Sequence, residues 1–155
     1  TYNNLFEPEK FDESQVPEQI YQFKSGIDTW SLNKYFGGSI KSFRFDCWEA
    51  QKKINSTWSC DSHPHNYYIE ILSDLGLVGF VTIFVLFLSL VFIFFHQLKS
   101  FNLKDKEGYI FKAIFLLLFA EFFPIKSTGS FFSTYNAAYI FIILPIFVGM
   151  YKKNN

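Results

Sequence analysis

Two histidines near one end of a long apolar stretch are the residues of this sequence best suited to do chemistry. His63 and His65 flank a proline in "DSHPHNYYIEILSDLGLVGF", and Asn66 follows directly. The pattern from Asn66 to Leu75 predicts an amphipathic helix with Asn66 as its N-cap, which places His65 at the positive end of the helix dipole. An imidazole there can accept a proton or contact a phosphate, although a surface histidine with only a hydrogen-bonding role fits the same pattern.

A metal site is the second chemistry that we consider for this stretch. Asp61, His63 and His65 all carry ligand atoms, but Pro64 between the histidines and the lack of a third histidine make a poor match to zinc spacings. The sequence has no Asp-x-Asp motif for a metal-bound nucleotide sugar, and "STGS" is not part of a Walker loop. We therefore predict no metal and no cofactor.

Three charged residues elsewhere are candidates for substrate binding. Arg44 is the only arginine among the 14 lysine and arginine residues. A guanidinium can hold two phosphate oxygens at once. The alternative is that a single arginine stands at this position by chance. Glu121 and Lys126 lie where an apolar run ends, and such groups are either functional or simply reach the membrane interface. Lys126 and the four residues after it could form an anion-binding nest. The candidates for substrate binding are thus Arg44, Asn66, His63, Lys126 and Glu121, with His65 as the candidate catalytic residue.

The elements that position these residues follow from composition. The chain has 155 residues, is 50% hydrophobic, contains 22 phenylalanines and has a formal net charge of +0, which excludes a basic nucleic-acid binder and an acidic disordered tail. Residues 1–75 are polar with mixed charges, whereas nearly all the long apolar runs lie after residue 75. This pattern predicts an all-α integral membrane protein with a soluble N-terminal part.

Three apolar runs predict membrane-spanning helices over 76–95, 109–123 and 136–151. The first run has no charged residue and would cover about 30 Å as a helix, which is the thickness of a bilayer core. The other two are shorter, and we expect Pro145 to interrupt the third. The connection over 124–135 is predicted to be either a loop that dips below the membrane surface or an ordinary tight turn.

The distribution of lysine predicts the orientation of these spans. Lys99, Lys104 and Lys106 lie in the 96–108 connection, and Lys152 and Lys153 lie in the 152–155 tail. The twenty residues before the first span have no lysine or arginine. By the positive-inside rule, the 96–108 loop and the 152–155 tail are cytoplasmic, while residues 1–75 and 124–135 face outward.

The two cysteines lie in the outward segment. A disulfide between Cys47 and Cys60 would stabilise the fold by about 3 kcal/mol in the chain-entropy model, and a bacterial periplasm would allow it to form. Two unrelated reduced thiols are the alternative. The outward segment also shows a loose helical spacing from Val16 to Leu32, with Pro17 near the helix start, and a turn at Gly37 and Gly38.

Three stretches resemble the C-terminal portion of the O-antigen ligase/polymerase family, which are bacterial inner-membrane glycosyltransferases with many spans. The strongest is "HPHNYYIEILSDLGLVGF", which is similar to the family pattern of a histidine, a small or polar residue, nine arbitrary residues and Gly-x-x-Gly. The other two are "FGGSIKSFRFDC", similar to the Gly-rich part of the large periplasmic loop, and "FPIKSTGSFFSTYNA", similar to the final outward loop. Together they span residues 36–137.

This resemblance implies a polytopic helical bundle with a mostly helical periplasmic loop. It implies transfer of a glycan from undecaprenyl diphosphate to a hydroxyl of a glycan, lipid A-core or protein acceptor at the periplasmic face, without a metal or nucleotide. His65 would then be the base or phosphate contact, and Arg44 the diphosphate clamp. Family members carry further important arginines, so we expect this chain to be the C-terminal piece of a longer polypeptide that supplies them.

Acceptor choice stays open at this point. A ligase, a polymerase and a protein O-oligosaccharyltransferase share the matched motifs. A non-catalytic membrane subunit with a binding loop is the alternative from another class.

Overall fold

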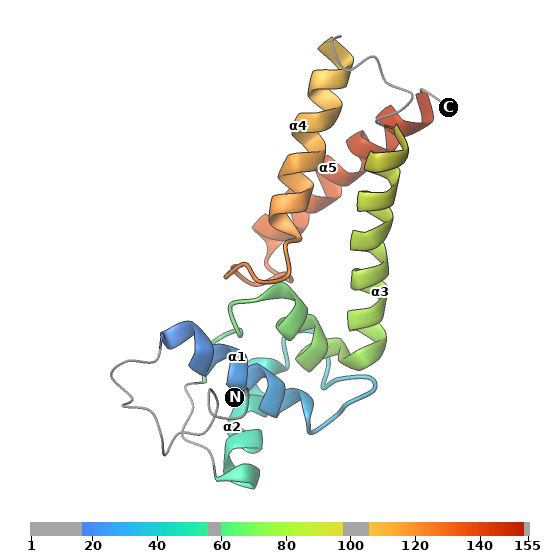
Figure 1. The fold of residues 1–155 in the computed structure, drawn as a ribbon. Helices are drawn as coiled ribbons and strands as arrows, with labels where there is room; N and C mark the ends of the chain where they lie inside the picture. Colours follow the sequence, from blue (N-terminus) through green and yellow to red (C-terminus); the bar gives the residue numbers. More distant parts are fainter. Residues whose placement is uncertain (1–16, 56–59, 98–105, 154–155) are drawn as a thin grey trace, which may run out of the picture.

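The computed structural model describes residues 17–55, 60–97 and 106–153, and within these ranges the chain forms α-helices and no strand. This confirms the all-α class. Residues 1–16, 98–105 and 154–155, which include most of the predicted 96–108 connection, lie outside the described residues. The five helices, drawn in Figure 1, are α1 (Glu18–Trp30), α2 (Phe43–Ile54), α3 (Tyr67–Gln97), α4 (Lys106–Glu121) and α5 (Thr134–Lys153).

The second part of α3 stands beside α4 and α5, and the other helices lie at one end of this group. Figure 1 shows α1, α2 and the start of α3 together at that end, while the end of α3, the start of α4 and the C-terminal end of α5 lie at the opposite end. The chain therefore runs along the group three times. The 96–108 connection therefore joins α3 to α4 at one end of the group, and the 124–135 connection joins α4 to α5 at the other end (Figure 1). The sequence predicted these two connections on opposite sides.

Phenylalanine side chains hold the three-helix group together. The ring centroids of Phe94 on α3 and Phe115 on α4 lie 3.7 Å apart, and those of Phe111 on α4 and Phe147 on α5 lie 4.9 Å apart. Such stacked pairs add to the free energy gained by burying the rings. The buried residues of this cluster are Phe87, Leu90, Phe111, Phe115, Leu118, Phe122, Ile140 and Phe147.

Two of the helices are long and apolar enough to cross a membrane. They are Tyr67–Gln97, with 31 residues, and Thr134–Lys152, with 19 residues, and only 11% of the apolar window of each is buried in the structure. The predicted second span corresponds to α4, whose 16 residues extend about 24 Å. Contrary to the predicted interruption, α5 continues through Pro145.

The first span does not begin with a new helix, because α3 already starts at Tyr67 and changes direction at Gly76. There the backbone has φ 66° and ψ −164°, a left-handed conformation that favours glycine. Gly37 packs back to back against it: a Cβ on Gly76 would lie 2.4 Å from the Tyr35 carbonyl, and a Cβ on Gly37 would lie 2.3 Å from the Asp74 carbonyl. The two glycines thus permit a direct crossing of backbones at the bend.

The part of the chain before the apolar runs is tied together covalently. The predicted disulfide between Cys47 and Cys60 is present, with the two Cα atoms 5.9 Å apart. Cys47 lies on α2, a helix that the sequence did not predict, and its side chain is fully buried. The bridge therefore anchors the start of the 60–66 segment, which carries both candidate histidines, to a helix.

Candidate functional site

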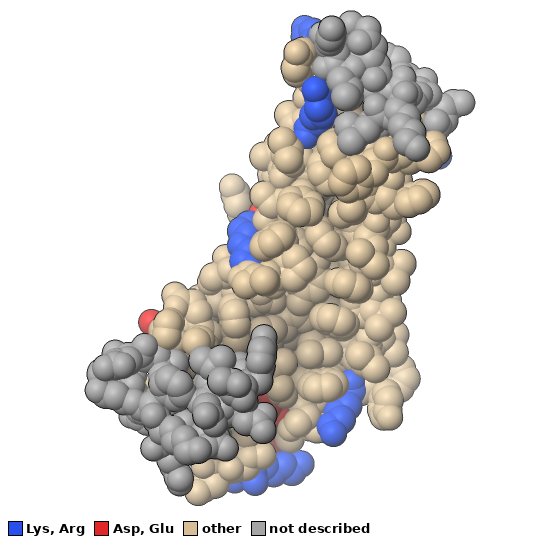
Figure 2. Space-filling model, viewed as in Figure 1, with Lys and Arg blue, Asp and Glu red and all other residues tan. Residues whose placement is uncertain are grey.

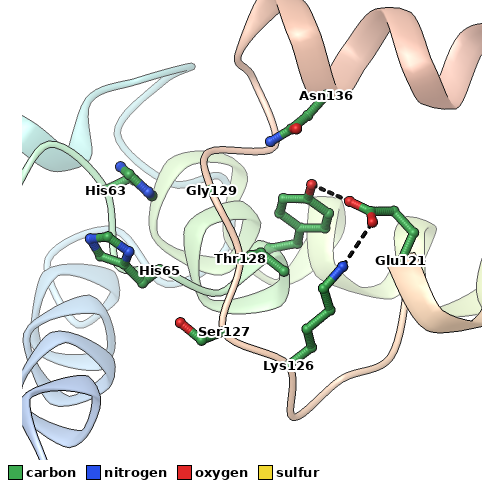
Figure 3. Close-up of a pocket in the computed structure, with 9 residues that line it drawn as sticks. His63, His65, Glu121, Lys126, Ser127, Thr128, Gly129 and Asn136 are labelled. Atoms are coloured by element: carbon green, nitrogen blue, oxygen red, sulfur yellow. Dashed lines mark hydrogen bonds and ion pairs between the residues drawn. The ribbon is translucent and has the colours of Figure 1, made fainter.

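The predicted histidines, Glu121 and Lys126 line one open pocket at the end of the three-helix group. Its volume is about 510 Å³, and it lies where the 60–66 segment meets the 122–133 loop between α4 and α5. Figure 3 shows the two imidazoles on one side of the backbone through Thr128 and Gly129 and the Glu121–Lys126 pair on the other. The pocket is lined by His63, His65, Tyr67, Glu121, Lys126, Ser127, Thr128, Gly129 and Asn136.

The backbone of His65 is held in an unusual conformation. Its φ is 53°, in the left-handed region that is uncommon for residues other than glycine, although histidine adopts it more often than most. The Thr128 N–H donates to the His65 carbonyl oxygen at 2.7 Å, which fixes the peptide against the 122–133 loop. Strained non-glycine backbone of this kind concentrates at functional sites.

The side chain of His65 is oriented by a carboxylate. Its Nε2 lies 3.1 Å from Oδ2 of Asp61, and the two side chains are 30% and 48% exposed. Hydrogen bonds from the Ser62 backbone N–H and from His65 lower the pKa of Asp61, so this carboxylate is ionised at neutral pH. An ionised acceptor at Nε2 favours the tautomer that leaves Nδ1 with a lone pair able to accept a proton.

His63 is a neutral neighbour of this pair. The ring centroids of His63 and His65 lie 4.2 Å apart. Burial, with a smaller contribution from the neighbouring His65 ring, lowers the pKa of His63 below its ordinary value of 6.5. The Nδ1 atom lies 2.9 Å from the Ser62 hydroxyl, and the Nε2 atom is buried. A hydrogen bond with the Thr128 backbone partly offsets the lowering of the His63 pKa.

The opposite side of the pocket carries a compact charged group. Lys126 Nζ donates to Glu121 Oε2 at 2.8 Å, and the Tyr67 hydroxyl donates to Glu121 Oε1 at 2.5 Å (Figure 3). The Lys126 side chain is 39% exposed and that of Glu121 is 18% exposed. An ammonium group has three donors, so Lys126 can hold Glu121 and still offer N–H groups to an anion in the pocket.

Asn66 has a different role from the predicted substrate contact. Its Oδ1 accepts from the N–H groups of Tyr68 and Ile69 at 3.0 and 3.1 Å, which makes it the N-cap that the sequence predicted. Its Nδ2 donates to the carbonyls of Pro124 and Lys126 at 2.8 and 3.0 Å. The residue is 3% exposed. The amide is therefore occupied inside the protein, and Asn66 positions the pocket instead of lining it.

A buried carboxylate that the sequence did not single out holds the other end of the same loop. Glu70 lies one helical turn after Asn66 and is 2% exposed. It accepts from the Ser130 hydroxyl at 2.6 Å and from the Phe131 N–H at 2.5 Å. Asn66 and Glu70 thus clamp the 122–133 loop onto the first turns of α3, and this clamp sets the shape of the pocket.

Arg44 lies apart from this constellation. It is exposed on α2 and is not among the residues that line the pocket. Within this structure, the cation nearest to the imidazoles in the pocket lining is Lys126. Among the described residues, no group of three or more His, Cys, Asp or Glu side chains is placed to hold a metal ion.

Comparisons with protein-family models, with curated proteins and with solved structures gave no match to this chain.

Besides Glu70, sequence reasoning missed the roles of Asp61 and Tyr67. Asp61 was considered only as a metal ligand, although its spacing of four residues from His65 is compatible with a direct contact across one turn of chain. Tyr67 directly follows the candidate cap, and the prediction of an amphipathic helix gave it no separate role. Tyr67 lines the pocket with His65 and donates to Glu121. The sequence alone does not show this contact, because it depends on how the chain after α4 folds back onto the start of α3.

Proposed function

We propose that this chain forms the transfer site of a membrane glycosyltransferase that moves a glycan from undecaprenyl diphosphate onto an acceptor hydroxyl at the outer face of a bacterial inner membrane. The observation that carries the proposal is the pocket in which an Asp61-oriented His65 lies together with Lys126 at the end of two candidate spans. The three stretches that resemble the O-antigen ligase/polymerase family support it.

The pocket contains groups suited to both halves of such a transfer. A sugar hydroxyl must lose a proton as it attacks, and an imidazole with a free Nδ1 lone pair is a suitable base near neutral pH. The leaving diphosphate keeps its negative charge, which Lys126 and the exposed Ser127 hydroxyl can stabilise.

The position of Arg44 changes one expectation. The resemblance implies Arg44 as the diphosphate clamp, whereas in this geometry Lys126 is the better candidate for the first phosphate contact. An ammonium binds phosphate as a point charge, without the two-pronged geometry of a guanidinium. We propose Arg44 as a more distant contact to the glycan or to the outer phosphate.

The location of the site at a membrane surface is supported by several features. A lipid carrier needs its prenyl chain in the bilayer and its sugars in water, and the pocket lies at the end of the apolar helices. The uncharged face of α3 in Figure 2 is suited to contact with lipid or with further helices of a bundle. The disulfide favours an oxidising compartment at that end, and Lys106, Lys112 and Lys152 favour a cytoplasmic location for the other.

The test is glycan transfer by a His65→Ala variant in cells, measured on the acceptor while membrane insertion is followed separately. We expect transfer to fall by about 100-fold or more, because general-base catalysis contributes at least this much. His96→Ala, at the far end of α3, is the matched control and should transfer normally. Treatment with a chelator should leave transfer unchanged. Normal transfer by an inserted His65→Ala protein would instead favour a non-catalytic subunit that binds through its outward loop.

A further inference from the structure

A second surface of the outward part has a distinct character. In the segment from Lys34 to Lys41, the three large apolar side chains point outward: Tyr35 is 70% exposed, Phe36 is 79% exposed and Ile40 is 60% exposed. Both flanking lysines are exposed. Three large apolar side chains on one short loop, with a lysine at each end, form a small amphipathic patch that the proposed transfer reaction does not use.

Four backbone N–H groups of this segment donate to acceptors within the protein. The N–H groups of Gly37, Gly38 and Ser39 donate to the carbonyls of Asn33, Ser73 and Asp74 at 2.9, 3.3 and 3.0 Å. The Lys41 N–H donates to the Asp74 side chain at 2.6 Å. Loops in water usually leave such groups to the solvent. Irregular backbone close to hydrocarbon requires internal partners of this kind.

The segment is also fixed at the level where the first candidate span begins. The carbonyls of Lys34 and Tyr35 accept from the N–H groups of Leu77 and Val78 at 2.9 and 3.2 Å. These N–H groups are left free by the bend at Gly76, so the loop supplies their partners. Leu77 and Val78 are themselves 42% and 54% exposed, and they begin the apolar surface of the span. The patch is therefore continuous with that surface.

We propose that the 34–41 segment is a membrane anchor, with Tyr35, Phe36 and Ile40 inserted into the interfacial layer of the leaflet where the second part of α3 begins. This inference rests on the proposed membrane insertion of α3. Tyrosine side chains are enriched at this depth, and lysines can extend from it to the headgroups. The anchor would hold the outward helices, and with them the pocket, at a fixed height above the lipid.

The experiment places an environment-sensitive fluorophore on single cysteines introduced into the protein with its native disulfide intact. The protein is reconstituted into phosphatidylcholine vesicles that contain nitroxide-labelled lipids, with the nitroxide either near the headgroup or near the bilayer centre. The test position is Phe36→Cys. Two matched controls are Val85→Cys on the exposed face of α3, 54% exposed in the structure, and Glu49→Cys on the exposed face of α2.

We expect the label at position 36 to be quenched more by the shallow nitroxide than by the deep one. The label at position 85 should show the opposite preference, and that at position 49 should be quenched by neither. If the label at 85 is quenched and the label at 36 is not, the anchor is disproved. This holds whether the emission of the label at 36 indicates water or a covering protein surface. If the label at 85 is also unquenched, the exposed face of α3 does not meet lipid, and the anchor fails because it depends on that contact. The proposed transfer reaction is then still tested separately by the His65→Ala variant.

Discussion

His65 is held by two partners that act on different parts of the residue. The Thr128 N–H fixes its peptide, which has a positive φ of 53°, and the Asp61 carboxylate contacts its ring at Nε2. The backbone contact comes from a loop more than sixty residues later in the chain, whereas the side-chain contact comes from four residues earlier. This division means that the position of the ring and its tautomer can be perturbed separately.

Asp61→Asn should change the tautomer of His65 without removing its ring. An amide can donate to Nε2 as readily as it accepts, so the preference for a free Nδ1 lone pair is lost. We expect glycan transfer to fall by about 10-fold, less than for His65→Ala, because the pair is partly exposed and solvent can replace the carboxylate. Steady-state transfer in reconstituted vesicles measures this. Glu49→Gln, an exposed carboxylate on α2, is the control, and equal rates for wild type and Asp61→Asn would remove Asp61 from the mechanism.

At the level of elements, the first turns of α3 act as a bracket for the loop between α4 and α5. Asn66 and Glu70 hold both ends of this loop, and the Tyr68 hydroxyl donates to the Phe122 carbonyl at 2.7 Å. Each of these side chains is buried. The amphipathic helix that the sequence predicted over 66–75 therefore buries polar groups as well as apolar ones, because a polar loop packs against it.

Asn66→Asp separates the two tasks of this residue. A carboxylate still accepts from the N–H groups of Tyr68 and Ile69, so the cap survives. It cannot donate to the carbonyls of Pro124 and Lys126, and it repels them. We expect a loss of about 1–3 kcal/mol in the free energy of unfolding and faster proteolysis within 122–133. Asn66→Ser, which caps without the added charge, should lose less, and wild-type protease resistance of Asn66→Asp would contradict the clamp.

The bend in α3 provides a matched pair of glycine substitutions. Gly76→Ala places a Cβ 2.4 Å from the Tyr35 carbonyl at a residue with a positive φ. We expect it to lower the free energy of unfolding by about 1–3 kcal/mol. Gly149→Ala on α5 is the control, because a Cβ there meets nothing within 4 Å, and its stability should stay within about 1 kcal/mol of wild type. Thermal unfolding in detergent compares the two, and equal shifts would argue against the tight backbone crossing.

For the whole molecule, the disulfide is the covalent link between α2 and the histidine segment. Cys47→Ser should lower the free energy of unfolding by up to about 3 kcal/mol and change mobility on a non-reducing gel. Cys60→Ser and the double variant should behave in the same way, since each removes one and the same bridge. Greater stability of the double variant than of either single variant would point to harm from the unpaired thiol instead.

Much of the fold follows from local patterns in the sequence, and much of the pocket does not. The apolar runs predicted α3, α4 and α5 to within a few residues, apart from the start of α3, and Asn66 was correctly predicted as a cap. His63, His65, Glu121 and Lys126 were chosen separately and lie in one pocket. Glu70 was missed, because periodicity cannot show which loop will return to a buried carboxylate. Arg44 is not among the residues that line this pocket, since the rarity of a residue type carries no information about its position.

The clamp on the 122–133 loop also determines when the pocket can exist during biosynthesis. The hydrogen bonds that build it join residues 54 to 61 positions apart, and all of α4 lies between the partners. A nascent chain that has released only the histidine segment from the ribosome has no Lys126, no Thr128 and no partner for Glu70. The pocket is therefore completed only after α4 and the residues that follow it have been synthesised, so a product truncated before Lys126 would lack it.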